Sequence, residues 1–274
     1  MSCSISSIYC SLGDLTYVIS STTTNLNLQT LIGTTNYTSK VNKKIYINSG
    51  VIVGSTSTSN SAITIPSGFG GNIRLINYGS IQGAGGASNG GTGGNAIFAG
   101  SSGVIIDNRG TIYAGGGGGG QGGTGGGGYY GTYYLSVCGP CSEVCCGYEC
   151  SDDPPCSGGY QPGNGCAEGG LRWFCPYNVY TSGGAGGSGG IGQGYNQSAT
   201  GGSSGSAGGS NAGTGGTGGT GGSFGSTGST GGTGSNGNYS NGSAGSSGGL
   251  AGYYIVNNGN VTWTTLGAVA GRVG

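Results

Sequence analysis

Residues 213–237 read GTGGTGGTGGSFGSTGSTGGTGSNG, with a glycine at every third position, nine times in succession. Thirteen of these 25 residues are glycine, and nine of the thirteen follow this period. A helix of polyproline-II type has 3 residues per turn, so the period places a glycine edge along one side of the helix. Without a Cβ on that edge, another backbone can approach closely. The segment therefore predicts polyglycine-II helices that pack backbone against backbone.

A flexible linker is the main alternative, because glycine- and serine-rich sequence is typical of linkers. We keep this alternative for residues 183–249, although the strict triplet and the scarcity of charge favour a folded bundle. Collagen shares the period but needs abundant proline. The chain has only six prolines, and none lies between Tyr177 and the C-terminus. Because a polyproline-II-type helix has no internal hydrogen bonds, its backbone groups must pair with neighbouring helices or with water.

The composition excludes several classes of protein. Of the 274 residues, 74 are glycine and 5% are charged, with a net charge of zero; an ordinary globular domain has roughly 25% charged residues. Such a chain lacks the basic face that nucleic-acid binding needs. It contains no apolar run of about 18 residues that would insert into a membrane, and its start lacks the features of a signal peptide.

Short strand-like repeats precede and follow the glycine-rich blocks. An Asn-x-Gly step followed by β-forming residues recurs at 48–54, 77–83 and 108–113, with 257–263 as a weaker fourth copy. The first three copies start 29 and 31 residues apart, and each copy has an apolar, strand-like segment before it. The Asn-x-Gly step suits a turn with positive φ. We expect stacked or paired strand–turn–strand units, with the C-terminal strand returning to the early β layer.

The predicted fold class is all-β or irregular, with no α-helical domain. It combines a small β-strand platform of strand–turn–strand units with a packed bundle of polyglycine-II helices. Loops are expected where the glycine pattern lapses, at 195–200, 223–224 and 235–240. The predicted regions are an N-terminal attachment segment (1–45), β-strand repeats with glycine-rich excursions (46–128), a cysteine- and aromatic-rich insert (129–180), the polyglycine-II bundle (181–252) and a C-terminal return strand (253–274).

The insert contains eight of the ten cysteines: Cys138, Cys141, Cys145, Cys146, Cys150, Cys156, Cys166 and Cys175. Five acidic residues and one arginine give residues 138–175 a net charge of −4. Disulfides are the preferred interpretation, because they stabilise loops that bury little apolar surface. Tetrahedral zinc sites remain the alternative, although a second clean C-x-x-C and any histidine are lacking. The pairing stays open, since eight cysteines allow 105 connectivities.

The sequence contains no catalytic constellation. The chain has no histidine, which is the commonest general base. The adjacent Asp152 and Asp153 are interpreted as a solvated turn, with weak calcium binding as the alternative. The run from 115 to 120 is not followed by the Gly-Lys-Ser/Thr of a phosphate-binding loop. We therefore expect no enzyme activity, no cofactor and no resident metal.

The order of these motifs resembles a known family. Asn-x-Gly-x-Ile strands, glycine-rich blocks such as 90–97 (GGTGGNAI) and an ending with Val-Thr-Trp263 and Gly-Arg-Val-Gly are similar to glycine-rich bacteriophage tail-fibre proteins. The glycine-rich part resembles the receptor-recognising adhesins at the tips of T-even-like long tail fibres. The resemblance covers roughly 45–128 and 181–274, and the cysteine-rich insert departs from the family pattern. It implies a polyglycine-II sandwich with variable loops at its distal end, located at the tail fibre tip of the virion.

The resemblance implies an adhesin that docks on other tail-fibre subunits through its N-terminal part. Its loops are then expected to bind a host surface polysaccharide or an outer-membrane protein, because aromatic loop residues give large contacts at low entropic cost. A purely structural fibre or tip protein and, less favoured, an ice-binding protein are the alternatives. The candidate receptor-binding residues are aromatic: Tyr129, Tyr130, Tyr133, Tyr134, Tyr148, Tyr160, Trp173, Phe174, Tyr177, Tyr180, Tyr195, Phe224 and Tyr239.

Overall fold

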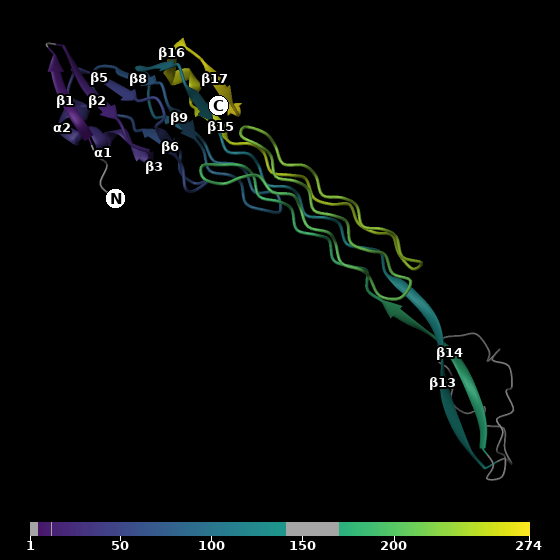
Figure 1. The fold of residues 1–274 in the computed structure, drawn as a ribbon. Coiled ribbons are helices and arrows are strands. Elements are labelled where there is room, and N and C mark those ends of the chain that lie inside the picture. The colour runs from purple at the N-terminus through teal and green to yellow at the C-terminus, as the bar shows by residue number, and fades with distance from the viewer. Residues whose placement is uncertain (1–4, 12, 141–169) are drawn as a thin grey trace.

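The computed structural model describes residues 5–11, 13–140 and 170–274. The chain forms an elongated molecule with a β-strand body at one end, a bundle of extended glycine-rich segments in the middle and a long β-hairpin at the other end (Figure 1). The first described strand, β1 (Ile5–Ser11), and the C-terminus both lie at the β-strand body, so the bundle and the hairpin are an excursion that leaves this body and returns to it.

The β-strand body is a stack of coils with three sheets as its sides. The first sheet contains β1 (Ile5–Ser11), β2 (Asp14–Ile19), β5 (Asn42–Ile47), β8 (Ile73–Asn77), β11 (Val104–Asn108) and β16 (Val261–Thr265). The second contains β3 (Thr23–Thr24), β6 (Ile52–Gly54), β9 (Ser80–Gln82), β12 (Thr111–Tyr113) and β17 (Ala268–Ala270). The third contains β4 (Leu26–Asn27), β7 (Ile63–Ile65), β10 (Ile97–Ala99), β15 (Tyr253–Val256) and β18 (Arg272–Val273).

The chain visits the three sheets in turn, and within them every pair of neighbouring strands is parallel except β1 with β2. The stacked strand–turn–strand units are therefore confirmed, as is the return of the C-terminal strand, since β15 pairs with β10. The described helices are short: α1 (Leu28–Ile32), α2 (Thr34–Thr38) and the 3-10 helix η1 (Asn258–Asn260). The Asn27 side chain caps α1 by accepting from the Gln29 and Thr30 amides.

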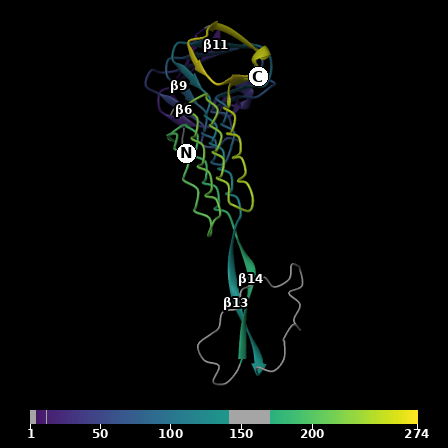
Figure 2. The ribbon, with the colours of Figure 1, turned by 90° about the vertical axis from the view of Figure 1, so that its right-hand side faces the viewer.

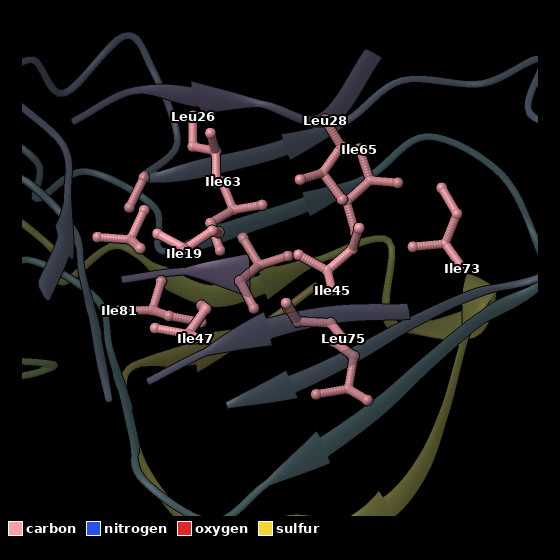
Figure 3. Close-up of a cluster of buried hydrophobic side chains, with 14 of the residues drawn as sticks. Ile19, Leu26, Leu28, Ile45, Ile47, Ile63, Ile65, Ile73, Leu75 and Ile81 are labelled. Atoms are coloured by element: carbon pink, nitrogen blue, oxygen red, sulfur yellow. The ribbon is translucent and has the colours of Figure 1, made fainter. Parts of the chain in front are cut away.

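The core lies inside this three-sided body. Alternate residues of each strand point inward, and residues of successive coils stack in register. Ile45 pairs with Leu75 and Leu75 with Ile106, and all three are fully buried. Figure 3 shows Ile45 and Leu75 among aliphatic side chains from several coils. Burial of one such side chain contributes about 1.5–3 kcal/mol, so each coil is stabilised mainly by the apolar side chains of its neighbours.

The register corrects the alignment of the sequence repeats. Asn77 pairs with Asn108, as the second and third copies predict. Asn77 also pairs with Ile47, so the alignment of Asn48 with Asn77 is wrong by one residue, because the turn after β5 is longer than the turn after β8. The fourth copy is wrong as well. Val261 pairs with Val104, which places residues 257–260 before a strand of the first sheet instead of after one.

The repeated asparagines form a buried ladder. Asn77 Nδ2 donates to Asn108 Oδ1 at 2.8 Å, and Asn108 Nδ2 donates to the Leu266 carbonyl at 2.7 Å. Both side chains are fully buried, and such amides are stable there only when they are hydrogen-bonded. The turn glycines have different roles. A positive φ is confirmed at Gly50 (78°) but not at Gly79, where a Cβ would overlap a carbonyl oxygen of the preceding coil.

The ion pairs between described residues lie on the β-strand body. The Arg109 guanidinium donates to both carboxylate oxygens of Asp107 at 3.1 Å and lowers the pKa of that carboxyl. Lys44 pairs with Asp14 at 2.7 Å. Lys43 is fully buried, its ammonium donates to the Ser39 and Gly70 carbonyls, and burial lowers its pKa. Lys43 thus contributes to the packing of the first coils.

The bundle is held by backbone hydrogen bonds between extended segments. Residues 115–126 run through its centre and donate in three directions with a three-residue step. Gly116, Gly119, Gly122 and Gly125 donate to the carbonyls of residues 193, 190, 187 and 184, all at 2.8 Å. Gly117, Gly120, Gly123 and Gly126 donate to those of residues 226, 229, 232 and 235 at 2.8–3.0 Å, and Gly115 and Gly118 donate to Gly94 and Gly91.

The same central segment accepts hydrogen bonds from three further segments. Amides of 213–222, 243–252 and 86–90 donate to its carbonyls. Residues 115–126 therefore have six hydrogen-bonded neighbours, and the segments lie side by side in both views of the molecule (Figure 2). Because a neighbouring backbone lies on every side, a Cβ at any of the central glycines 115–120, 122, 123, 125 or 126 would overlap a carbonyl oxygen.

Hydroxyl side chains satisfy the backbone where a neighbouring segment is missing. Beside Gln121 and Thr124 the 83–95 segment has ended, and both residues are exposed. Their amides donate instead to Ser246 Oγ and Ser243 Oγ at 2.7 and 2.8 Å. The same arrangement joins Gly127 to Ser240, Ala185 to Ser206, Ser188 to Ser203, Ile191 to Thr200, Thr214 to Ser235 and Thr220 to Ser229. In the bundle, glycine thus occupies positions that face a neighbouring backbone, and serine or threonine occupies positions at the solvent-exposed edge, where its hydroxyl accepts from a backbone amide.

We expect Gly119→Ala to lower the free energy of unfolding by about 3 kcal/mol, because the added methyl overlaps the Gly219 carbonyl oxygen in a site without space. The measurement is chemical denaturation of the purified protein. Gly201→Ala is the matched control, since a Cβ there meets no atom within 4 Å. Equal stability of the two variants would contradict the tight backbone packing.

We expect Gly232→Ser to raise the stability by about 1 kcal/mol. The Gly232 amide donates to the Thr217 carbonyl, as Ser229 does to Thr220 and Ser235 does to Thr214, but glycine has no hydroxyl to accept from the Thr217 amide. A serine would supply that acceptor and would also restrict the unfolded chain. Thermal unfolding of Gly232→Ser and Gly232→Ala separates the two effects. A serine variant no more stable than the alanine variant would refute the capping role of the hydroxyl.

Candidate functional site

A long antiparallel hairpin extends from the end of the bundle that lies away from the β-strand body (Figures 1 and 2). Its strands are β13 (Gly128–Pro140) and β14 (Gly170–Thr181), with Gly128 paired to Thr181 and Tyr129 to Tyr180 at its base. The strands continue directly from the glycine-rich segments, so the bundle fixes the base of the hairpin.

Three exposed tyrosines meet at this base. The ring centroids of Tyr180 and Tyr239 are 4.8 Å apart, and Tyr129 lies 6.2 Å from Tyr180 and 6.4 Å from Tyr239. The exposed fractions are 37% for Tyr129, 60% for Tyr180 and 62% for Tyr239. We call Tyr129, Tyr180 and Tyr239 the tyrosine cluster. Isolated exposed aromatics are ordinary, whereas a cluster that packs on itself and still faces solvent marks an interaction surface.

Two asparagines hold the tyrosine cluster in place. Asn238 Oδ1 accepts from the Tyr129 amide at 2.8 Å, and Asn238 Nδ2 donates to the Tyr129 carbonyl at 2.9 Å. Asn211 Nδ2 donates to the same carbonyl at 3.0 Å, and the Tyr239 amide donates to Gly127. The two loops that connect bundle segments at this end are thereby tied to the first residues of the hairpin, so the backbone that carries Tyr129 and Tyr239 is held before any ligand arrives.

The structure separates the predicted aromatic residues into groups. Tyr130, 38% exposed, follows Tyr129 on the hairpin. Tyr195 and Phe224 lie at the opposite end of the bundle, against the β-strand body. The Tyr195 ring packs on Gly54, and the Phe224 ring lies 5.6 Å from that of Tyr113. Both are half-buried, so they help to join the bundle to the β-strand body and do not approach the tyrosine cluster.

Other predicted residues lie outside what the structure describes. Tyr148, Tyr160 and the Asp152–Asp153 pair belong to residues 141–169, as do Cys141, Cys145, Cys146, Cys150, Cys156 and Cys166. The backbones of Tyr133, Tyr134, Cys138, Trp173, Phe174, Cys175 and Tyr177 lie in the hairpin strands, but their side chains are not among the described atoms. The predicted disulfides therefore stay predictions.

Sequence reasoning missed the two asparagines that position the tyrosine cluster. The lapse of the glycine pattern at 235–240 did mark the loop that contains Asn238. Asn211 has a positive φ of 61°, which asparagine tolerates better than most residues, and it follows a Gly-Gly-Ser turn sequence. An Asn in such a turn next to a break in the triplet is the signal that could have identified it.

The described segments that form the tyrosine cluster contain no charged residue. Residues 173–271 contain no Asp, Glu, Lys or Arg, and neither do residues 110–142. Among the residues that the structure describes, no cluster of His, Cys, Asp or Glu could hold a metal ion. None of the described helices is long and apolar enough to cross a membrane. The chemistry available at this end is therefore that of aromatic faces, phenol hydroxyls, amides and backbone groups.

Comparison with known proteins connects this geometry to a family. A family model described as "Phage tail fibre adhesin Gp38" matches residues 14–165. The chain is also similar to a solved structure, the gp37-gp38 adhesin tip complex of the bacteriophage S16 long tail fiber. That similarity has a TM-score of 0.46 and 20% sequence identity and covers 94% of this chain and 81% of the other. A search of curated proteins found no match.

Proposed function

The chain belongs to the phage tail fibre adhesin Gp38 family, and we propose that it contacts the host cell through the hairpin end of the bundle while its β-strand body attaches to the fibre. Membership of the family makes it a tail fibre adhesin, a binding protein and not an enzyme. The proposal adds which end of the molecule contacts the host cell and which end attaches to the fibre.

The exposed tyrosine cluster is the observation that carries the proposal. The aromatic residues at the other end of the bundle, Tyr195 and Phe224, are half-buried against the β-strand body. At the hairpin end the rings of Tyr129, Tyr180 and Tyr239 pack on one another and remain 37–62% exposed. Leaving three large rings in water is unfavourable unless a partner covers them. This asymmetry supports recognition of the host receptor at the hairpin end, with the insert (residues 129–180) as part of the receptor-binding region.

We infer that the glycine-rich segments are polyglycine-II helices. The support is the three-residue step of their hydrogen bonds and the six neighbours of residues 115–126, because a helix with 3 residues per turn directs its backbone groups to three sides. Such a bundle is a rigid spacer whose stability depends little on side chains. It can therefore present variable loops at its end without repacking a core.

We further propose that the first coil attaches the chain to another tail fibre subunit, at the tip of the fibre. The first coil, made of β2, β3 and β4, lies within the predicted attachment segment 1–45. Together with α1, α2 and β1 it lies at the end of the molecule opposite the hairpin (Figure 1). Attachment there leaves the hairpin pointing away from the fibre. The strands within 46–113 and 253–274 then complete the β-strand body, and the glycine-rich segments 83–95, 115–127 and 181–252 form the bundle.

We expect the double variant Tyr180→Ala/Tyr239→Ala to inhibit phage adsorption at least tenfold less effectively than the unchanged protein, because it removes the two most exposed rings of the cluster. The measurement is competition by purified protein against phage on the host strain. Tyr78→Ala is the matched control, since Tyr78 is 42% exposed but lies on the β-strand body. An unchanged protein that fails to compete at all would favour the purely structural role instead.

We expect Thr30→Lys/Thr35→Lys to weaken capture of the adjoining fibre subunit at least tenfold, because both residues are exposed on or beside the first coil and two buried charges oppose docking. The measurement is co-purification with the fibre subunit expressed from the same phage. Thr262→Lys, an exposed position on the last coil, is the control. Loss of capture in the Thr262 variant alone would move the attachment face to the other end of the β-strand body.

A further inference from the structure

We propose that the tyrosine cluster binds a neutral saccharide on the host surface, a repeating unit of a surface polysaccharide rather than a protein loop or an anionic group. The proposal rests on the proposed function, since it names the ligand class of the same surface. It is carried by three observations on described residues: the stacking surface, the fixed position of the rings and the absence of charge.

The Tyr180 and Tyr239 rings supply the stacking surface. Their centroids are 4.8 Å apart with planes inclined at 66°, so they form an angled corner instead of a flat pair. Tyr129 completes the corner at 6.2 and 6.4 Å. A hexose has an apolar C–H face and a rim of hydroxyls. The corner offers an aromatic face to the C–H face of the sugar and three phenol groups to its hydroxyls. Tyrosine combines apolar and polar contacts in this way at interfaces.

The backbone that carries the Tyr129 and Tyr239 rings is positioned before binding, and the rings pack on one another. Asn211 and Asn238 make three hydrogen bonds to the Tyr129 backbone, and Tyr239 is tied to Gly127. A small ligand gains affinity only when little conformational entropy is lost on binding. This fixed corner is therefore suited to a ligand of one or two sugar rings, whereas a stable protein interface needs about 800 Å² on each partner.

The charge pattern selects among saccharides. Binding of phosphate or carboxylate groups in proteins relies on Arg, Lys or clustered backbone amides. Residues 173–271 and 110–142 contain no Arg or Lys, so the hairpin base offers no cation to an anionic sugar. A neutral repeating unit is the ligand that this composition favours.

The test uses the purified full-length protein and polysaccharide released from host lipopolysaccharide by mild acid, which removes the lipid. We expect binding by calorimetry that changes less than threefold between 50 and 500 mM salt, since no ion pairs are involved. Tyr180→Ala and Tyr239→Ala should each weaken it at least tenfold, whereas Tyr180→Phe and Tyr239→Phe, which keep the rings, should retain most of the affinity. Tyr78→Ala should bind as the unchanged protein does.

A second arm separates the ligand class from the proposed function. The same proteins are tested on host outer-membrane proteins in detergent micelles and on whole host cells. Tyrosine-dependent binding to cells and micelles without binding to the polysaccharide would overturn the saccharide proposal and leave the receptor-binding function intact. Strongly salt-dependent polysaccharide binding would also overturn it. Failure to bind cells at all would overturn the proposed function itself.

Discussion

Hydrogen bonds between backbones of adjacent segments are the interaction on which the rest of this molecule depends. Residues 115–126 exchange such bonds with six neighbouring segments, and no apolar core lies in the bundle, since the hydrophobic core cluster is confined to the β-strand body. Buried backbone N–H and C=O groups that lack a hydrogen-bond partner are costly. Each segment is therefore held in place because its N–H and C=O groups pair with those of its neighbours. Glycine is needed because the distance between segments leaves no space for a Cβ.

This constraint separates the scaffold from the surface it presents. In an ordinary domain a loop is supported by side chains of a core, and changing the loop disturbs their packing. Here the loops at 208–212 and 236–241 begin and end on backbone-bonded segments, and a few contacts at the hairpin base connect them to the hairpin: Asn211 and Asn238 bond Tyr129, Thr181 bonds Ser210, and the Tyr239 ring packs on Tyr180. The length and sequence of the hairpin beyond Tyr129 and Tyr180 can then vary without a cost to the bundle. The β-strand body, which does have a core, provides the fixed end.

The sequence predicted the architecture better than its details. The triplet period and the Asn-x-Gly repeat indicated extended glycine segments and stacked strands, because both patterns follow directly from backbone geometry. The alignment of Asn48 with Asn77, and of residues 257–260 with the earlier Asn-x-Gly turns, was wrong. A turn can gain residues at a corner of the coil without changing the buried residues that set the strand register. The sequence could not distinguish the aromatic candidates that pack against the β-strand body from those that remain exposed at the hairpin end. Tyr195 and Tyr239 both lie in breaks of the triplet, and only the direction of the adjoining segments decides that one faces the β-strand body and the other solvent.

The lack of charge on the bundle is not a requirement of its fold. Thr227, Thr230 and Thr233 are exposed. Within the described bundle, Ser229 and Ser235 accept from backbone amides, whereas these three threonines do not. A lysine or glutamate at these positions would meet only water, and surface charge ordinarily favours solubility. The neutrality of 173–271 therefore reflects the surroundings in which the bundle works. Long-range electrostatic forces on such a neutral spacer are weak. Under the proposed function, contact with the host then depends on short-range interactions at the hairpin end, where the exposed tyrosine rings lie at the base of the hairpin.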